Sequence, residues 1–283
     1  MVSARNSALL LSLAASVWCV TPVAVTRAET LDKSQFNLFN PTPAALMREM
    51  STDRPDTTES AYTVDAGHLQ IESSFFDYTT DDDNGDFDGW SVLPMNVKLG
   101  LMNNMDLQFV FEPYLREELE GESTDGFGAT QLRLKINLWG NDGGDTALAV
   151  MPFVQFPTAD DDFGATDHVE GGVIFPFAMS LPREWSLGAM AEFDAVRDAA
   201  DEDYELQFVH TATLGHDIVG DLAGYVEYVG VASTESGAGY VAVLGGGLTY
   251  GVNENVQLDC GVNVGLSEDA DDFNAFAGIS VRR

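Results

Sequence analysis

Apolar residues recur at every second position through most of this chain, from residue 66 onward. In residues 256–266 the apolar side chains alternate with Gln257, Asp259, Gly261, Asn263 and Gly265. Successive side chains of a β-strand point to opposite faces, so this period of two predicts strands with one apolar and one polar face. A helix would scatter the charged residues onto its apolar stripe. We therefore expect an all-β fold.

Twelve such segments follow one another along the chain. They cover residues 67–78, 90–101, 105–115, 128–139, 146–157, 169–181, 185–196, 204–216, 222–232, 240–251, 256–266 and 273–281. Strands of soluble sandwiches average about 5–6 residues, whereas a tilted strand needs about 9–11 to cross a membrane. The lengths predict an antiparallel transmembrane β-barrel of about 12 strands, within a range of roughly 10–14.

The connections between these segments differ in length and charge. The chain has 46 acidic and 13 basic residues, a net charge of −33. Half of the acids fall in the odd-numbered connections, at residues 79–89, 116–127, 158–168, 197–203, 233–239 and 267–272. The even-numbered connections are short and nearly neutral. Outer-membrane barrels have long outer loops and short inner turns, so this parity favours a barrel over a soluble sandwich. The acidic excess excludes nucleic acid as a partner.

The N-terminus has the pattern of an export signal. Arg5 precedes an apolar run at residues 8–20, and small residues stand before Glu29. We expect residues 1–28 to be a cleaved signal peptide, residues 29–65 a periplasmic lead-in or plug segment, and residues 66–283 an outer-membrane β-barrel. No later apolar run is long enough for a membrane-spanning helix. The expected partners are outer-membrane lipid and the barrel-assembly machinery.

Charged and polar residues within the predicted strands share the face opposite the apolar one. A charge on the lipid face near the midplane costs about 2–4 kcal/mol, so these residues should line the lumen and contact a solute. The predicted lumen-lining residues are His68, Gln70, Glu72, Asn96, Lys98, Gln108, Glu112, Arg133, Lys135, Glu192, Glu227 and Asp259.

The segment Thr52-Asp53-Arg54-Pro55-Asp56, followed by residues 67–72, 96–101 and 132–138, resembles the opening and first strands of an outer-membrane family. That family is labelled transporter, or putative MetA-pathway of phenol degradation, and the resemblance covers residues 53–281. It implies an outer-membrane barrel assigned to transport of hydrophobic or aromatic compounds, with no catalytic residues. The chain departs from common outer-membrane barrels in ending on residues 280–283 without an aromatic residue.

Two segments leave alternatives open. Asp82, Asn84, Asp86 and Asp88 lie at every second position, a spacing that can bring oxygen ligands to one calcium ion, and the other interpretation is a solvated loop. The segment around Arg54 is either an ion-pair plug in the periplasmic mouth or a simple lead-in segment.

No catalytic motif accompanies these features, because the chain has neither a Gly-x-Ser-x-Gly element nor the ligand spacing of a catalytic metal site. We therefore expect no enzyme activity and no obligatory cofactor. The sequence predicts a channel or transporter that passes small solutes by passive diffusion, and the family resemblance implies that these solutes are hydrophobic or aromatic. The alternative is a non-conducting structural or divalent-cation-bridging protein of the outer-membrane surface.

Overall fold

The computed structural model describes residues 32–82, 86–160, 168–197 and 203–283. The predicted signal peptide lies outside the described residues. One compact unit comprises Asp32–Arg283. A single turn of 3₁₀ helix, η1 (Ala44–Leu46), precedes the strands. In the described part of the chain, no helix is long and apolar enough to cross a membrane.

The described residues form fifteen antiparallel strands. They are β1 (Leu69–Asp81), β2 (Phe87–Val92), β3 (Met95–Met102), β4 (Met105–Phe111), β5 (Tyr114–Leu119), β6 (Glu122–Gly126), β7 (Thr130–Trp139), β8 (Thr146–Phe156), β9 (Glu170–Leu181), β10 (Trp185–Arg197), β11 (Tyr204–Val219), β12 (Leu222–Ser233), β13 (Val241–Asn253), β14 (Val256–Gly265) and β15 (Phe273–Arg282).

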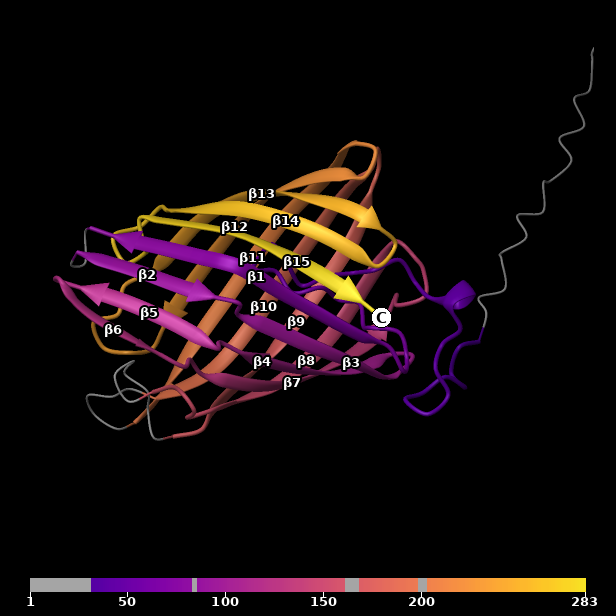
Figure 1. Ribbon diagram of the computed structural model, residues 1–283, viewed down its shortest axis with the longest axis horizontal. Coiled ribbons are helices and arrows are strands. Elements are labelled where there is room, and N and C mark those ends of the chain that lie inside the picture. The colour runs from indigo at the N-terminus through magenta and orange to yellow at the C-terminus, as the bar shows by residue number, and fades with distance from the viewer. Residues whose placement is uncertain (1–31, 83–85, 161–167, 198–202) are drawn as a thin grey trace, which may run out of the picture. The chain divides into compact units, whose positions relative to one another are not determined.

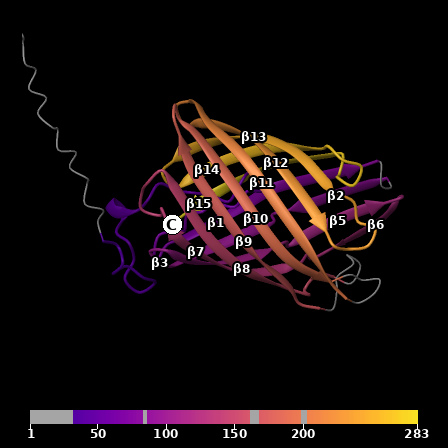
Figure 2. The same ribbon diagram turned by 180° about the vertical axis from the view of Figure 1, so that it is seen from behind.

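Twelve of these strands close into a ring. The order is β1, β3, β4 and then β7 to β15, and β15 pairs with β1 through ten residue pairs from Gln70↔Arg282 to Thr80↔Phe273 (Figure 1). The same ring seen from behind shows β8 to β12 running side by side (Figure 2). Closure leaves no unpaired edge in the ring. The predicted antiparallel β-barrel of about twelve strands is confirmed.

Strands β2, β5 and β6 extend the wall at the end opposite the short turns (Figure 1). β1 pairs with β3 through Leu69–Ser73 and with β2 through Asp77–Asp81, so β2 and β3 are two parts of one long strand. β4 and β5 are divided in the same way. The divisions fall at Pro94 and Pro113, because proline has no N–H to donate to a ladder.

The expectation that residues 79–89 and 116–127 are loops is therefore wrong in part. Strand β1 extends to Asp81, and β2 already begins at Phe87. Strands β5 and β6 form a hairpin with a tight turn at Glu120-Gly121. Both turn residues have positive φ, at 51° and 84°. The hairpin combines acids with serine, threonine and glycine, which is why its sequence resembles a polar loop.

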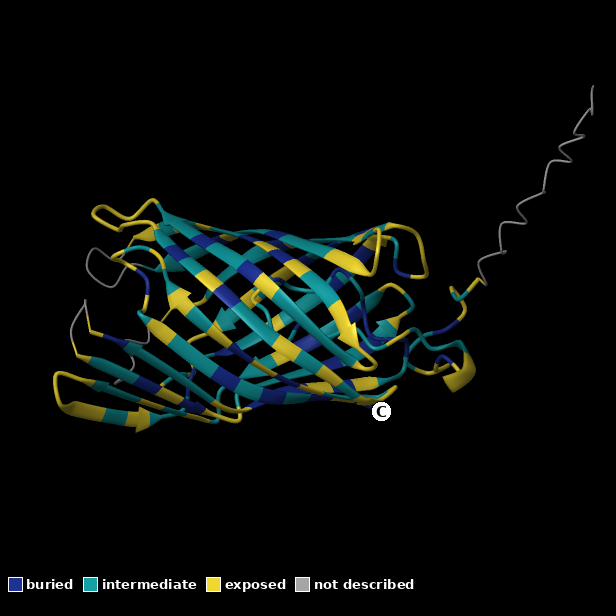
Figure 3. Ribbon diagram, turned by 90° about the horizontal axis from the view of Figure 1, so that it is seen from above, coloured by how far each residue is buried: buried dark blue, intermediate teal, exposed yellow. Residues whose placement is uncertain are grey.

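Burial alternates along the strands, as Figure 3 shows by its change of colour from residue to residue. The exposed positions are apolar and the buried positions are mostly polar or charged, which is the reverse of a soluble core. On the outer surface the rings of Phe193 and Phe208 are tilted, with centroids 5.0 Å apart, and Phe208 stacks on His210 at 5.2 Å between ring centroids. His210, which interrupts the apolar pattern of its segment, thus belongs to an aromatic row.

Exposed aromatic side chains also occur at the end with the short turns. Trp139 ends β7 and Trp185 begins β10, where its ring lies 4.4 Å from that of His216. Aromatic residues flank the apolar band of a membrane barrel at both interfaces, because their rings suit the headgroup region. The outer surface therefore has the profile of a lipid-facing wall.

This profile predicts that the cost of an outward charge depends on depth. Val226 faces outward near the middle of β12, and Val252 faces outward at the short-turn end of β13. We expect Val226→Lys to lower the free energy of unfolding by about 2–4 kcal/mol and Val252→Lys by about 0–1 kcal/mol. Urea unfolding in lipid vesicles, followed by tryptophan fluorescence, measures both. Equal costs at the two depths would contradict the assignment of the lipid face.

Candidate functional site

A stretch of the chain before the first strand lies inside the ring. We call residues 48–66 the inner segment. Its backbone N–H groups donate to carboxylates that face inward from opposite sides of the wall: Val64 to Asp106 on β4 at 2.9 Å, and Thr57 to Glu227 on β12 at 2.8 Å. Because these two strands are far apart around the ring, the inner segment crosses the lumen.

The Asp53 carboxylate is the centre of a buried ion cluster. Its Oδ1 lies 2.5 Å from Lys135 Nζ on β7, and its Oδ2 is paired with Lys98 on β3. Lys98 also pairs with Glu72 on β1, which accepts the backbone N–H of Asp53 at 3.0 Å. The two lysine side chains are only 2% and 1% exposed. The two lysines thus tie β3 and β7 to the Asp53 carboxylate, and Glu72 ties β1 to the backbone of the same residue.

Burial opposes ionisation of Asp53, but the charges of Lys135 and Lys98 outweigh it and hold the pKa of this carboxyl well below its usual range. Glu59 lies beside the same cluster and pairs with Arg133 at 2.6 Å. Burial and the negative charge of Asp53 raise the pKa of Glu59 to about 7. The cluster therefore holds one fixed carboxylate and one that titrates near neutral pH.

The Arg54 side chain extends away from the Asp53 cluster, toward β14 and β15. Its Nη2 donates to Asp259 Oδ1 at 2.6 Å, and its Nη1 to Ser74 Oγ at 2.6 Å. The guanidinium lies over the Phe276 ring at 5.6 Å. A Cβ at Gly278 would stand 2.4 Å from Arg54 Nη2, so only glycine leaves room for this side chain. Neighbouring Thr52 accepts a hydrogen bond from Gln257 at 3.1 Å.

Glu227 holds the far side of the inner segment. Its carboxylate accepts the N–H groups of Thr57 and Thr58 at 2.8 Å each, and the Thr58 hydroxyl at 2.6 Å. Asp56 lies next to this site, and burial together with the charge of Glu227 raises its pKa to about 7. Backbone amides and hydroxyls, rather than a basic side chain, neutralise Glu227 here.

The final residues of the chain contact both ends of the inner segment. Arg282 donates to the backbone oxygens of Arg48 at 2.9 Å and Glu254 at 3.2 Å, and lies 3.7 Å from Asp65. Arg48 in turn pairs with Asp65 at 3.3 Å. The basic ending, which departs from the aromatic ending of common barrels, thus contributes contacts to the inner segment.

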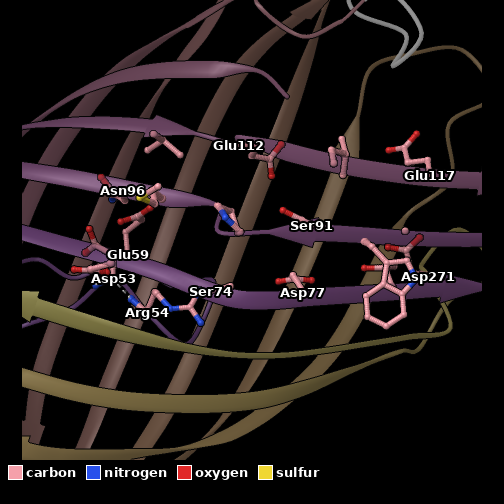
Figure 4. A pocket seen from close by; sticks show the side chains of 18 of the residues that line it. Asp53, Arg54, Glu59, Ser74, Asp77, Ser91, Asn96, Glu112, Glu117 and Asp271 are labelled. Carbon is pink, nitrogen blue, oxygen red and sulfur yellow. Dashed lines mark hydrogen bonds between the residues drawn. The ribbon is translucent and has the colours of Figure 1, made fainter. Parts of the chain in front are cut away.

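A cavity of about 520 Å³ lies in the lumen beside Asp53, Arg54 and Glu59 (Figure 4). Its wall consists of β1, the divided strands β2/β3 and β4/β5, Arg133 of β7, and Asp271 from the last connection. Figure 4 shows Asp77, Ser91 and Glu112 around its middle and Glu117 and Asp271 at its far end. The inner segment forms one end of this cavity.

Most of the predicted lumen residues lie on the inward face, where Gln70, Glu72, Lys98, Gln108, Lys135, Glu227 and Asp259 are buried. Asn96 donates to Gln108, Glu112 lines the cavity, and Glu192 on β10 lies beside Asp194. His68 lies in the turn before β1 with its Nε2 2.7 Å from the Thr42 oxygen, outside this group.

Several residues of the site are absent from the sequence-based set. Asp106 on β4 and Asn137 on β7 bind the backbone of the inner segment, and Asp77 and Ser91 line the cavity. Asp106 and Asn137 share the alternation phase of Gln108 and Lys135, so the period of two could have identified them. Ser91 carries no such signal, because its strand is interrupted at Pro94, three residues later.

The suggested calcium loop is only partly described, because Asn84 lies outside the described residues. Asp88 is on β2, where its carboxylate accepts the Tyr78 hydroxyl at 2.5 Å, and the backbone N–H of Asp82 donates to Asp272 at 2.9 Å. No group of three or more His, Cys, Asp or Glu side chains in the described residues is placed to hold a metal ion. Calcium binding here stays a prediction.

Comparisons with known proteins agree on the architecture. The family described as "Putative MetA-pathway of phenol degradation" matches residues 52–282. The COG4313 outer membrane channel from Pseudomonas putida F1 superposes with a TM-score of 0.60 at 12% identity, covering 82% of this chain and 100% of that one. The NanC porin superposes with a TM-score of 0.53 at 8% identity, covering 75% of this chain and 98% of that one. No curated protein matches the sequence.

The buried cluster predicts a large penalty for removing one of its cations. Lys98→Met leaves Asp53 and Glu72 with less compensation in a buried site, so we expect the free energy of unfolding to fall by about 3–5 kcal/mol. The control is Arg116→Met, which breaks the half-exposed pair with Glu118 at 3.8 Å and should cost about 0–1 kcal/mol. Denaturant titration compares the two, and similar losses would show that the buried cluster contributes no special stability.

The raised pKa values of Asp56 and Glu59 predict that docking of the inner segment weakens as pH rises. Free carboxyls titrate near pH 4, so between about pH 4 and 7 the docked segment binds protons that the released segment does not. Docking should therefore be stronger at pH 5 than at pH 8.

Amide hydrogen exchange of residues 48–66, corrected for the intrinsic rates, measures the opening free energy. Asp56→Asn and Glu59→Gln should each flatten its pH dependence. An opening free energy that increases from pH 5 to pH 8 is incompatible with these two carboxyls as the controlling groups.

Proposed function

We propose, from the premise that the chain belongs to the family described as "Putative MetA-pathway of phenol degradation", that it is an outer-membrane channel for small solutes. The observation that carries the proposal is a closed ring of strands, apolar outside and polar inside, whose lumen is crossed by a separate segment. In this proposal residues 1–28 direct export and are cleaved, and the barrel-assembly machinery inserts the ring into outer-membrane lipid.

The inner segment is proposed to act as a plug at the periplasmic mouth. It is attached by side-chain contacts rather than as a strand of the ring, so it can leave without opening the wall. At one side, two wall carboxylates hold the inner segment, Glu227 through three hydrogen bonds and Asp259 through an ion pair with Arg54. At the other side, the Asp53 cluster joins three strands. Release at the Glu227 side would open a path along β12 to β14 while Asp53 stays fixed.

Passive diffusion is the proposed mode of transport, since the inward face offers polar and charged side chains for a solute to contact and the sequence contains no P-loop motif. Hydrophobic or aromatic solutes are proposed on the family description alone. Acidic residues at the outer end would concentrate cations there through the local field.

Planar-bilayer conductance tests the proposal directly. Changing Glu227→Gln together with Asp259→Asn removes two carboxylates that hold the inner segment, leaving Arg54 unpaired. A loss of about 3 kcal/mol of docking free energy would increase the undocked fraction more than about 100-fold, so conductance should rise markedly.

The matched control is Glu118→Gln, a carboxylate on the outward face of β5 whose loss should leave conductance unchanged. Folding of each variant is checked by heat-modifiable migration in a gel. If the folded wild-type protein and the double variant both carry no current under any condition, the channel proposal fails, and a non-conducting surface protein becomes the better interpretation.

A further inference from the structure

The cavity above the inner segment is built on the inward face of the divided strands. The ladders place Asp77 opposite Ser91 and Thr79 opposite Gly89, and they place Ser91 opposite Leu115 and Gly89 opposite Glu117. All of these residues therefore share one face. The Phe87 ring lies over Gly89, 3.1 Å from where a Cβ would stand, so the glycine leaves room for this apolar side chain on the cavity wall. The cavity is thus a regular feature of the wall and not a gap left by a loop.

Its acids divide into two groups. Those near the inner segment are neutralised: Asp53 and Glu72 by lysines, and Glu59 by Arg133. Beyond them, Asp77, Glu112 and Glu117 have no Lys or Arg within ion-pair distance among the described residues, and Arg54 is paired with Asp259 instead. Asp77 instead accepts the Asn274 side-chain amide at 2.6 Å, so this part of the cavity has more acidic than basic side chains.

Ser91 supplies an independent sign of a missing ligand. Its side chain is only 9% exposed, and its hydroxyl has no hydrogen-bond partner. Figure 4 shows it between Asp77 and Glu112, on the cavity wall. Buried hydroxyls are nearly always hydrogen-bonded, because an unpaired one costs about 1–3 kcal/mol. A ligand that reaches Ser91 would therefore find a polar group already removed from bulk water.

The size and the remaining lining identify the class of ligand. A volume of about 520 Å³ far exceeds what a bare metal ion fills and falls in the range of small-molecule sites, about 300–1,000 Å³. Phe87, Val110 and Leu115 add an apolar surface to the acids. In the described residues, the acids are not grouped as ligands of a metal ion would be. Charge and apolar surface together suit a molecule that is cationic at one end and apolar at the other.

We propose that this cavity binds a small organic cation, a primary ammonium carried on an apolar or aromatic body. The ammonium would donate to Asp77, Glu112 and the Ser91 hydroxyl, while the body packs on Phe87 and Leu115. An aromatic face near an ammonium adds a cation–π attraction when water is excluded. The site deepens the proposed channel function, on which it rests for its role as a solute site, by assigning cationic solutes to that path.

The test is calorimetric titration of the purified full-length protein in detergent with three probes of similar shape: phenethylamine, phenethyl alcohol and phenylacetate. We expect phenethylamine to bind at least about 10-fold more tightly than the alcohol, and phenylacetate more weakly than both. Asp77→Asn combined with Glu112→Gln should weaken amine binding about 10-fold and leave the alcohol unchanged. Glu118→Gln, on the opposite face, is the matched control and should bind as wild type.

Three results would overturn the proposal: equal affinity for the three probes, amine binding that survives the double change, or binding of calcium ions alone that depends on Asp77 and Glu112 in place of the amine. Because calorimetry needs no current, this test is separate from the conductance experiment. Amine binding by a folded barrel without conductance contradicts the channel function only, and a conducting barrel that does not bind the amine contradicts this site only.

Discussion

A ring of strands in lipid must place its charges inside, and a charge that is buried there away from water needs a partner. Burying an ion without compensation costs several kcal/mol, so the inward face of this barrel depends on its counter-ions. The inner segment supplies them: Asp53 for Lys98 and Lys135, Glu59 for Arg133, and Arg54 for Asp259. The wall and the inner segment are therefore complementary in charge. Without the inner segment, Lys135, Arg133 and Asp259 of the wall would lose these ion-pair partners.

This complementarity divides the lumen into two zones. Around the inner segment, acids and bases are matched and the side chains pack closely. Beyond it, along β1, β2 and β5, the acids are unmatched and enclose open volume. A solute arriving from the acidic end would meet the negative zone first and the paired zone second. In the proposed channel, the unmatched acids would select the solute, and the inner segment would close the lumen.

The sequence predicts the ring well because a period of two is a local property. The polar phase of each strand placed Lys98, Lys135, Glu227 and Asp259 on one face before any pairing was known. It could not predict which of them meet, since Arg54 and Asp259 are separated by 205 residues and their contact depends on the register of the whole ring. The hairpin of β5 and β6 was missed for another reason: exposed acidic strands and polar loops have similar composition, and only the turn at Glu120-Gly121 distinguishes them.

The central claim is that the inner segment closes the lumen and that its movement opens it. The hydroxyls of Thr58 and Thr211 lie 2.6 Å apart, so cysteines at these two positions, with Cys260→Ser to remove the native thiol, should form a disulfide that fixes the segment to β11. Single-channel conductance of this variant is measured before and after reduction in the same bilayer. The account predicts a closed barrel when the disulfide is intact and a conducting one after reduction, and identical conductance in both states would contradict it.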